Sequence, residues 1–287
     1  MNAPLPPDSL TQTTSANWYA SLSLRVEQRE QRSVLTHNLH KGPLRVQKAL
    51  YPEGDAVCQI LTLHPPAGIA GGDQLEISLQ VNTGAHAQVT TPGAGKWYKS
   101  LGPLATQHIQ LTLAPQAVLE WLPQEVIVFD RACAQSATTI TLGEGARCIG
   151  WDILCLGRTA SGEHFNQGSF RQRIRLQRAD GTPLWQEAMH LQGADDAMRA
   201  KVALGGYSVT GTLWLAGVAP DATLLESLRT VAIPGVQCGI SALPHVTLVR
   251  VLSHSGEAAR QYLEAVWALA RPHILQRAAI KPRIWRT

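Results

Sequence analysis

Alternation of apolar and polar residues runs along most of this chain and limits the folds open to it. Apolar residues recur at even spacing in runs that cover residues 22–26, 75–81, 109–113, 170–176 and 207–215. Successive side chains of a β-strand point to opposite faces, so each run predicts a strand with one buried face. In the fourth run, Arg171, Arg173 and Arg175 take the face opposite the apolar residues. The sequence therefore predicts an all-β dominated fold.

A weak internal repeat accompanies the alternation. Two apolar residues at even spacing lead through a turn to an alanine, starting at Leu79, Leu111 and Ile140. A period of about thirty residues with strand content is typical of stacked β units, none of which buries its face alone. Chance similarity among strands rich in Leu, Thr, Gly and Ala explains the pattern equally well at this stage. We expect a stacked β-sheet or β-helix-like assembly.

Helix signals are few and fall late in the chain. Asp221 is placed to cap a short helix, and Ser255 a longer one that reaches Arg271 and is stopped by Pro272. Residues 187–203 show no clear periodicity and have room for a further short helix. The sequence therefore predicts two or three helices, mainly near the C-terminus.

No clear domain boundary interrupts the 287 residues. Residues 1–16 are rich in Pro, Ser, Thr and Asn, which predicts a disordered N-terminal arm, and residues 17–287 are expected to form a single domain. The arm lacks the basic and apolar regions of a secretory signal, and no window is apolar enough to span a membrane. Five cysteines without C-x-x-C spacing indicate reduced thiols, so we expect a cytoplasmic protein.

The composition favours protein partners over nucleic acid or membranes. Hydrophobic residues make up 45% of the chain and charged residues 16%, with a formal net charge of +4. So small a net charge does not indicate a nucleic acid or membrane partner. Sparse charge and eight tryptophans, which include Trp267 and Trp285, predict an exposed apolar surface that a protein partner covers.

Two segments rich in glycine and proline, residues 64–73 and 90–100, directly adjoin strand-like runs. Neither can be the interior of a regular helix or strand. Gly71-Gly72 and Pro92-Gly93 supply the backbone angles that tight junctions need. We therefore expect two ordered loops that pack close together.

Motifs of catalysis and of tight cofactor binding are missing. Gly95-Lys96 resembles part of a phosphate loop, but Thr90 and Trp97 stand where that motif needs Gly and Ser or Thr. The spacing of His37 and His40 would suit metal ligands on a helix, but their surroundings indicate a strand entering a turn. Solvated or hydrogen-bonded histidines are the favoured interpretation. We expect no catalytic residues and no tightly bound cofactor.

Five carboxylates lie in apolar surroundings: Asp73, Glu120, Glu125, Asp152 and Glu187. An isolated buried charge is unfavourable, so such groups are paired, capped or functional. For any one of them, a structural hydrogen bond or ion pair is the favoured interpretation. As a set they could line a polar passage for a hard or borderline cation, since oxygen ligands and retained water suit such ions.

Several blocks of sequence, taken together, resemble the UreD family of urease accessory proteins, also called UreH. Both loops carry the resemblance, together with residues 42–48, 50–54, 119–125, 150–163 and 282–287. The similarity runs from about residue 20 to the end of the chain. Asp152 stands where many members of the family carry Glu, which keeps the charge.

The resemblance implies a β-rich scaffold that is not an enzyme. It implies binding to the accessory protein UreF, which recruits the GTPase UreG, and docking on urease apoprotein. It further implies a water-filled internal route for transient Ni²⁺, for which we select Asp73, Asp152 and Glu187, with Glu120 and Glu125 as further candidates. Two alternatives remain at this stage: an all-β module that binds protein or carbohydrate without a metal role, and a hydrolase that uses the pair Glu120 and Glu125.

Overall fold

The computed structural model describes residues 17–286, so the expected arm over residues 1–16 lies outside the described residues. Its strands coil into a β-solenoid of about four turns, which confirms the predicted fold class. Two sheets face each other. The first has seven strands, in the order β14 (Pro183–Gln192), β13 (Ser169–Arg178), β11 (Cys133–Leu142), β8 (Ala105–Leu113), β5 (Gln74–Val81), β1 (Tyr19–Arg29) and β2 (Arg32–Lys41).

The second sheet has ten strands. Eight lie in the order β16 (Val236–Ala242), β17 (Val246–Ser253), β15 (Val209–Ala216), β12 (Arg147–Leu156), β9 (Val118–Leu122), β6 (His86–Thr90), β4 (Cys58–Leu63) and β3 (Arg45–Val46). Two short strands, β7 (Gly95–Trp97) and β10 (Val126–Val128), pair with each other, and β10 also pairs with β12.

The sequence repeat is structural. Leu111 on β8 pairs in register with Leu79 on β5 and with Ile140 on β11. The alanines that follow each turn, Ala85, Ala117 and Ala146, are buried at equivalent places. Each coil contributes one parallel strand to either sheet, so the same position recurs from coil to coil and stacks into a row. Chance similarity is thereby excluded.

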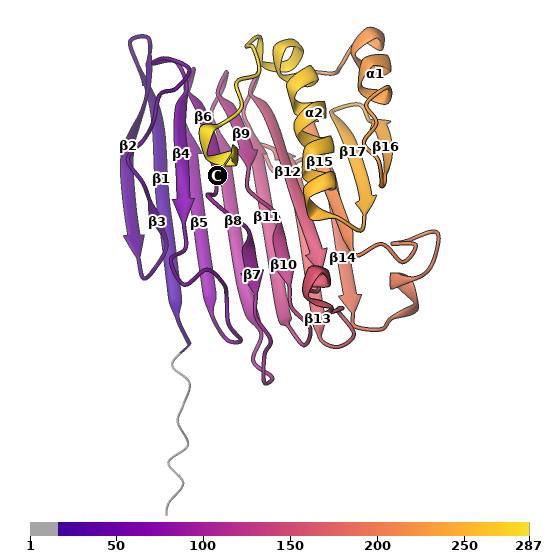
Figure 1. The fold of residues 1–287 in the computed structure, drawn as a ribbon. Coiled ribbons are helices and arrows are strands. Elements are labelled where there is room, and N and C mark those ends of the chain that lie inside the picture. The colour runs from indigo at the N-terminus through magenta and orange to yellow at the C-terminus, as the bar shows by residue number, and fades with distance from the viewer. Residues whose placement is uncertain (1–16, 287) are drawn as a thin grey trace, which may run out of the picture.

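Two cores stabilise the fold. Inward side chains of the two sheets form the larger one, and the outer face of the ten-stranded sheet forms the second with helices α1 (Ala222–Arg229) and α2 (Gly256–Leu275). Figure 1 shows both helices on that side of the molecule. Within residues 17–286, no helix is long and apolar enough to cross a membrane.

Both predicted helix caps are present. Asp221 Oδ1 accepts a hydrogen bond from Leu224 N at 2.7 Å, and Ser255 Oγ accepts one from Ala258 N at 3.2 Å. The predicted stop at Pro272 is wrong, because α2 continues to Leu275 and ends where Gln276 adopts a φ of 56°. The proline removes only one backbone donor, and burial of Ile274 and Leu275 holds the last turn.

Segment 187–203 begins as strand and continues in turns. Residues up to Gln192 belong to β14, and a short 3-10 helix, Asp196–Met198, follows. Pairing along β13 supplies the hydrogen bonds that decide its conformation. Local periodicity could not reveal that partner.

Loops 64–73 and 90–100 pack together as expected. Ile69 N donates to Lys96 O at 2.8 Å, and Tyr98 N donates to Ile69 O at 2.9 Å. A side chain at Gly68 would overlap the Tyr98 ring, so the loops approach too closely for any other residue there. The predicted close packing of two ordered segments is confirmed, but the second is not loop throughout, because Gly95–Trp97 forms strand β7 and pairs with β10.

Gly72 tests this junction. Its φ is +92°, and an added Cβ would overlap the Asn17 side chain. We expect Gly72→Val to lower the free energy of unfolding by about 1–3 kcal/mol, because the backbone would be strained. Gly93→Val in the facing loop is the control, since nothing lies within 4 Å of an added Cβ there. Equal melting temperatures for the two variants would contradict the prediction.

Candidate functional site

A cavity of about 350 Å³ lies between the two sheets. The paired loops bound it through residues such as His64, Gly68 and Lys96. The seven-stranded sheet lines the other side. The glycine-rich loops therefore form the wall of an internal space.

The seven-stranded sheet presents a polar row to this cavity. Gln107 on β8, Ser136 on β11 and Gln172 on β13 are aligned in register and all line the space. Ser136 is buried, as is its neighbour Thr138. In-register coils turn one polar residue per strand into a continuous polar row through an otherwise apolar interior.

Asp152 meets this row from the opposite sheet. It lies on β12 and lines the cavity, and Gln172 Nε2 donates to Asp152 Oδ2 at 2.5 Å. Burial raises the pKa of Asp152 to about 6, and the nearby negative charge of Glu187 adds to the rise. The carboxyl group therefore changes charge close to neutral pH.

Glu187 lies next to Asp152 at the edge of the sandwich. Its Oε1 accepts from Thr212 Oγ1 at 3.3 Å, and Thr212 pairs with Asp152 across β12 and β15. Its Oε2 accepts from Arg250 Nε at 3.1 Å. The Glu187 side chain is 32% exposed. The structure thus brings these two carboxylates together, one at the cavity and one at the surface.

Asp73 does not line the cavity. Its two carboxylate oxygens accept from Trp18 N at 3.1 Å and from Ala70 N at 2.9 Å, so it holds its own loop in shape. It still affects the loop end of the cavity. Burial lowers the pKa of His64, and the charge of Asp73 opposes that change.

Glu120 is fully buried in a separate cluster. It accepts from His86 Nε2 at 2.9 Å, from Trp267 Nε1 at 2.7 Å and from Arg271 Nη2 at 2.9 Å. Arg271 Nη2 also donates to Glu53 at 2.8 Å. Burial alone would raise the pKa of Glu120, but the hydrogen bond from His86 and the charges of His86 and Arg271 lower it to about 2. This cluster fastens α2 to the ten-stranded sheet.

Sequence reasoning missed the partners of Glu120. Arg271 follows the apolar positions of the predicted helix and lies four residues after Trp267, so it shares a helical face with that tryptophan. That placement was the one sequence signal that Arg271 is buried and needs an acidic partner. Glu125 lies elsewhere, 3.8 Å from Arg260 Nε on α2, and is not among the cavity residues.

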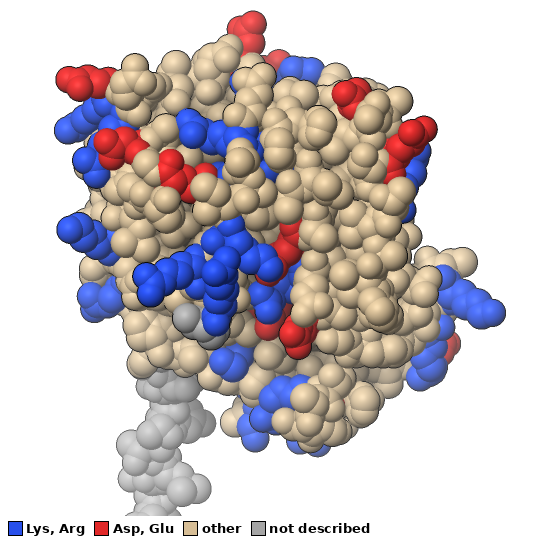
Figure 2. Space-filling model, turned by 45° about the horizontal axis from the view of Figure 1, so that its top comes forward, with Lys and Arg blue, Asp and Glu red and all other residues tan. Residues whose placement is uncertain are grey.

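The two tryptophans expected on an exposed surface are buried, so that part of the prediction is wrong. Trp285 stacks against Trp151 and Trp267, with ring centres 5.4 and 5.6 Å apart. Its Nε1 donates to Thr90 Oγ1 at 2.8 Å. Contacts between Trp267 and Trp285 therefore anchor the C-terminal segment to α2. Figure 2 shows a largely uncharged surface on this side of the molecule, with basic side chains gathered near its middle.

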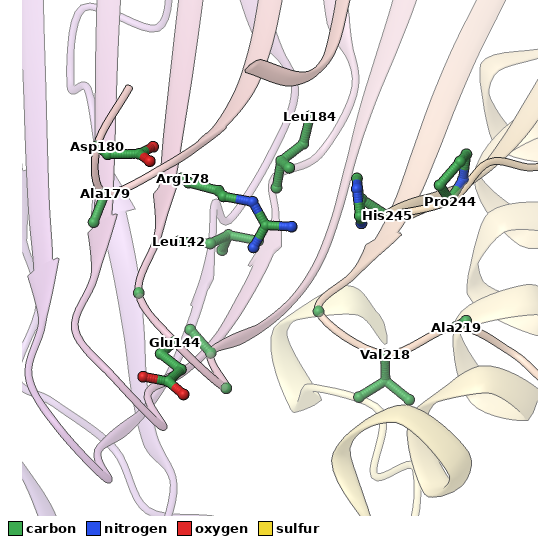
Figure 3. A pocket seen from close by; sticks show the side chains of 14 residues that line it. Leu142, Glu144, Arg178, Ala179, Asp180, Leu184, Val218, Ala219, Pro244 and His245 are labelled. Atoms are coloured by element: carbon green, nitrogen blue, oxygen red, sulfur yellow. The ribbon is translucent and has the colours of Figure 1, made fainter. Parts of the chain in front are cut away.

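A second cavity of about 490 Å³ lies at the turns of the solenoid (Figure 3). Arg178 and His245 line it, but so do Glu144 and Asp180. Charges of both signs give it no defined ligand preference. Among residues 17–286, no group of three or more His, Cys, Asp or Glu could hold a metal ion.

His37 and His40 both lie on β2, where a spacing of three places them on opposite faces. His37 Nε2 lies 3.2 Å from Ser23 Oγ. The interpretation as hydrogen-bonded or solvated histidines therefore agrees with the structure.

Comparison with known proteins identifies the family. The model of the UreD urease accessory protein family matches residues 19–286. The chain belongs to the UreD family. A urease accessory protein UreD of Dechloromonas aromatica is 48% identical over 95% of this chain and 96% of its own length. Another, from Pseudomonas fluorescens, is 45% identical over the full length of both.

UreD-family proteins are non-catalytic factors of urease maturation, a process that concerns nickel. Membership therefore implies partners in a urease maturation complex. It also removes support for the two alternatives, a carbohydrate- or protein-binding module and a hydrolase built on Glu120 and Glu125.

Replacing Arg271 tests the fastening of α2. Arg271→Met leaves Glu53 buried without its cation and Glu120 with His86 alone as its ion-pair partner, and we expect the free energy of unfolding to fall by about 3 kcal/mol or more. The control is Arg260→Met on the same helix, whose partner Glu264 keeps Lys281. We expect that change to remain below about 1 kcal/mol in urea unfolding. Similar losses in both variants would contradict a special role for Arg271.

The pKa of Asp152 predicts how stability depends on pH. The folded protein holds this proton up to about pH 6, whereas the ordinary value is 3.8. Stability therefore falls as the pH rises through this window. We expect Asp152→Asn to match the wild type near pH 3.5 and to be more stable by about 3 kcal/mol above pH 6. The exposed change Glu144→Gln serves as control, and a pH-independent difference for Asp152→Asn would disprove the assignment.

Proposed function

We propose that this chain is a scaffold that delivers Ni²⁺ to urease apoprotein through its own interior. The observation that supports this most is the polar row that leads through the cavity to Asp152 and on to Glu187 at the surface. Nickel is cargo in this proposal and is not a resident cofactor.

The side chains of the polar row suit the passage of Ni²⁺ better than its storage. Amide, hydroxyl and carboxylate oxygens favour a divalent cation that keeps part of its water shell. Transit needs sites that bind strongly enough for entry and weakly enough for exit. A closed Cys or His cage would retain the ion. Asp152 and Glu187 are close enough to act in succession, since the negative charge of Glu187 helps to raise the pKa of Asp152.

The other selected carboxylates take different parts. We propose that Asp73 acts at the loop end of the cavity, through its loop and its effect on His64. Glu120 has its oxygens engaged by His86, Gln88, Trp267 and Arg271, so we assign it to stability and leave it out of the route. Glu125 lies beside α2 and stays outside the route as well.

We further propose UreF, UreG and urease apoprotein as the partners and the cytoplasm as the compartment. The sparse charge of the helix-bearing side offers surface that protein partners can cover. All five cysteines are free, which suits a reducing compartment.

Substitutions along the row test the route. We expect Asp152→Leu and Glu187→Gln to remove most of the urease activation and nickel content, because each deletes an oxygen charge in the cation's path. Glu144→Gln, on an exposed turn, is the matched control and should activate urease normally. Formation of the complex with UreF and UreG is measured in parallel. Full activation by both route variants with complexes intact would show that nickel does not pass these side chains.

A further inference from the structure

Three arginines project from β13 on the outer face of the seven-stranded sheet. Arg171, Arg173 and Arg175 alternate with inward residues of the same strand, so they form one line with about 7 Å between neighbours. We call this line the arginine stripe. Arg171 and Arg173 are exposed, and Arg175 is half-buried.

No carboxylate shares the outward face with the stripe on the two neighbouring strands, β11 and β14. Arg171 lies between Gln135 on β11 and His190 on β14, and Arg173 lies between Ala137 and Ala188. Within residues 17–286, the side chain of neither arginine makes a hydrogen bond or an ion pair. Arg175 Nη2 donates only to Gly181 O, at 3.2 Å. Like charges this close repel one another, and the sheet offers nothing to offset that repulsion.

The surrounding face is open and uncharged. The other outward residues of β8, β11 and β14 are mainly Gln, Thr, Ala and His, with no Asp or Glu. Both α-helices cover the other sheet, as Figure 1 shows. The fold itself therefore gives no role to the stripe.

We infer that the arginine stripe is a docking surface for a carboxylate-rich face of a protein partner. Guanidinium groups bind carboxylates through paired hydrogen bonds, and arginine is enriched among the residues that dominate interface energies. The 7 Å spacing matches alternate residues of an extended strand. Nucleic acid is disfavoured, because the outward positions of β8, β11, β13 and β14 include no Phe, Tyr or Trp on which bases could stack.

The position of the stripe indicates which partner it seats. Glu187 lies on β14 and pairs with Ile174, between the positions that pair with Arg173 and Arg175. Because Ile174 points inward, the Glu187 side chain lies on the face opposite the stripe, at the edge strand β14. A partner on the stripe that also covers this edge would lie beside the surface end of the proposed route. This step rests on the proposed function, under which the recipient of the cation is urease apoprotein. The stripe thus orients the recipient at the exit.

A charge reversal tests the inference with the full chain in its complex with UreF. We expect Arg171→Glu with Arg173→Glu to weaken binding to urease apoprotein at least about tenfold, mainly through slower association, and to keep UreF bound. The control carries the same charge change at Arg29→Glu and Lys41→Glu, on β1 and β2 at the other end of the seven-stranded sheet, and should bind normally. Wild-type binding should weaken as salt increases, and the reversed variant should lose most of that dependence.

Several outcomes would overturn the inference. Unchanged urease binding by the reversed variant is the first, and loss of UreF with an unchanged melting curve is the second. The third is that the wild type binds a labelled single-stranded oligonucleotide and the charge-reversed variant does not, while both bind urease apoprotein equally. If the glutamates impair folding, Arg171→Gln with Arg173→Gln replaces them, and unchanged binding by that pair also refutes the stripe. Absence of urease binding by the wild type would instead refute the proposed function.

Discussion

In-register stacking of the coils is the constraint from which the other features follow. Equivalent residues of successive coils lie about 4.8 Å apart, because adjacent strands are hydrogen-bonded at that spacing. A leucine at one position therefore becomes an apolar row, as with Leu79, Leu111 and Ile140. A polar residue becomes a polar row, as with Gln107, Ser136 and Gln172. The cavity and the proposed route both use this geometry.

Two carboxylates on the ten-stranded sheet, Glu120 and Asp152, show how the surroundings of the same chemical group give it two different roles. Glu120 meets a full set of donors and positive charges, and its pKa falls to about 2. Asp152 meets an amide and a second carboxylate, and its pKa rises to about 6. The first is a permanent charge that holds a helix in place. The second changes charge near neutral pH and suits a group that must bind and release a cation.

The fold was predictable because its signals are local and repeated. Period-two patterning, the repeat and the caps at Asp221 and Ser255 all correspond to what the structure shows. The course of α2 past Pro272 was not predictable, because tertiary burial decides it. Nor could the sequence separate Glu120 from Asp152. Their partners, Arg271 and Gln172, lie 151 and 20 residues away along the chain, and only the coiling brings them together.

The outermost strands of the solenoid reverse direction, and this has a consequence for assembly. Within the coil the strands of each sheet run parallel, whereas the outermost pairs, β1 with β2, β13 with β14, β3 with β4 and β16 with β17, run antiparallel. A stack of identical coils would otherwise expose an edge that a second molecule could extend. The reversed strands present an edge whose direction no longer matches the coil. They therefore act as stoppers that oppose end-to-end growth into fibres.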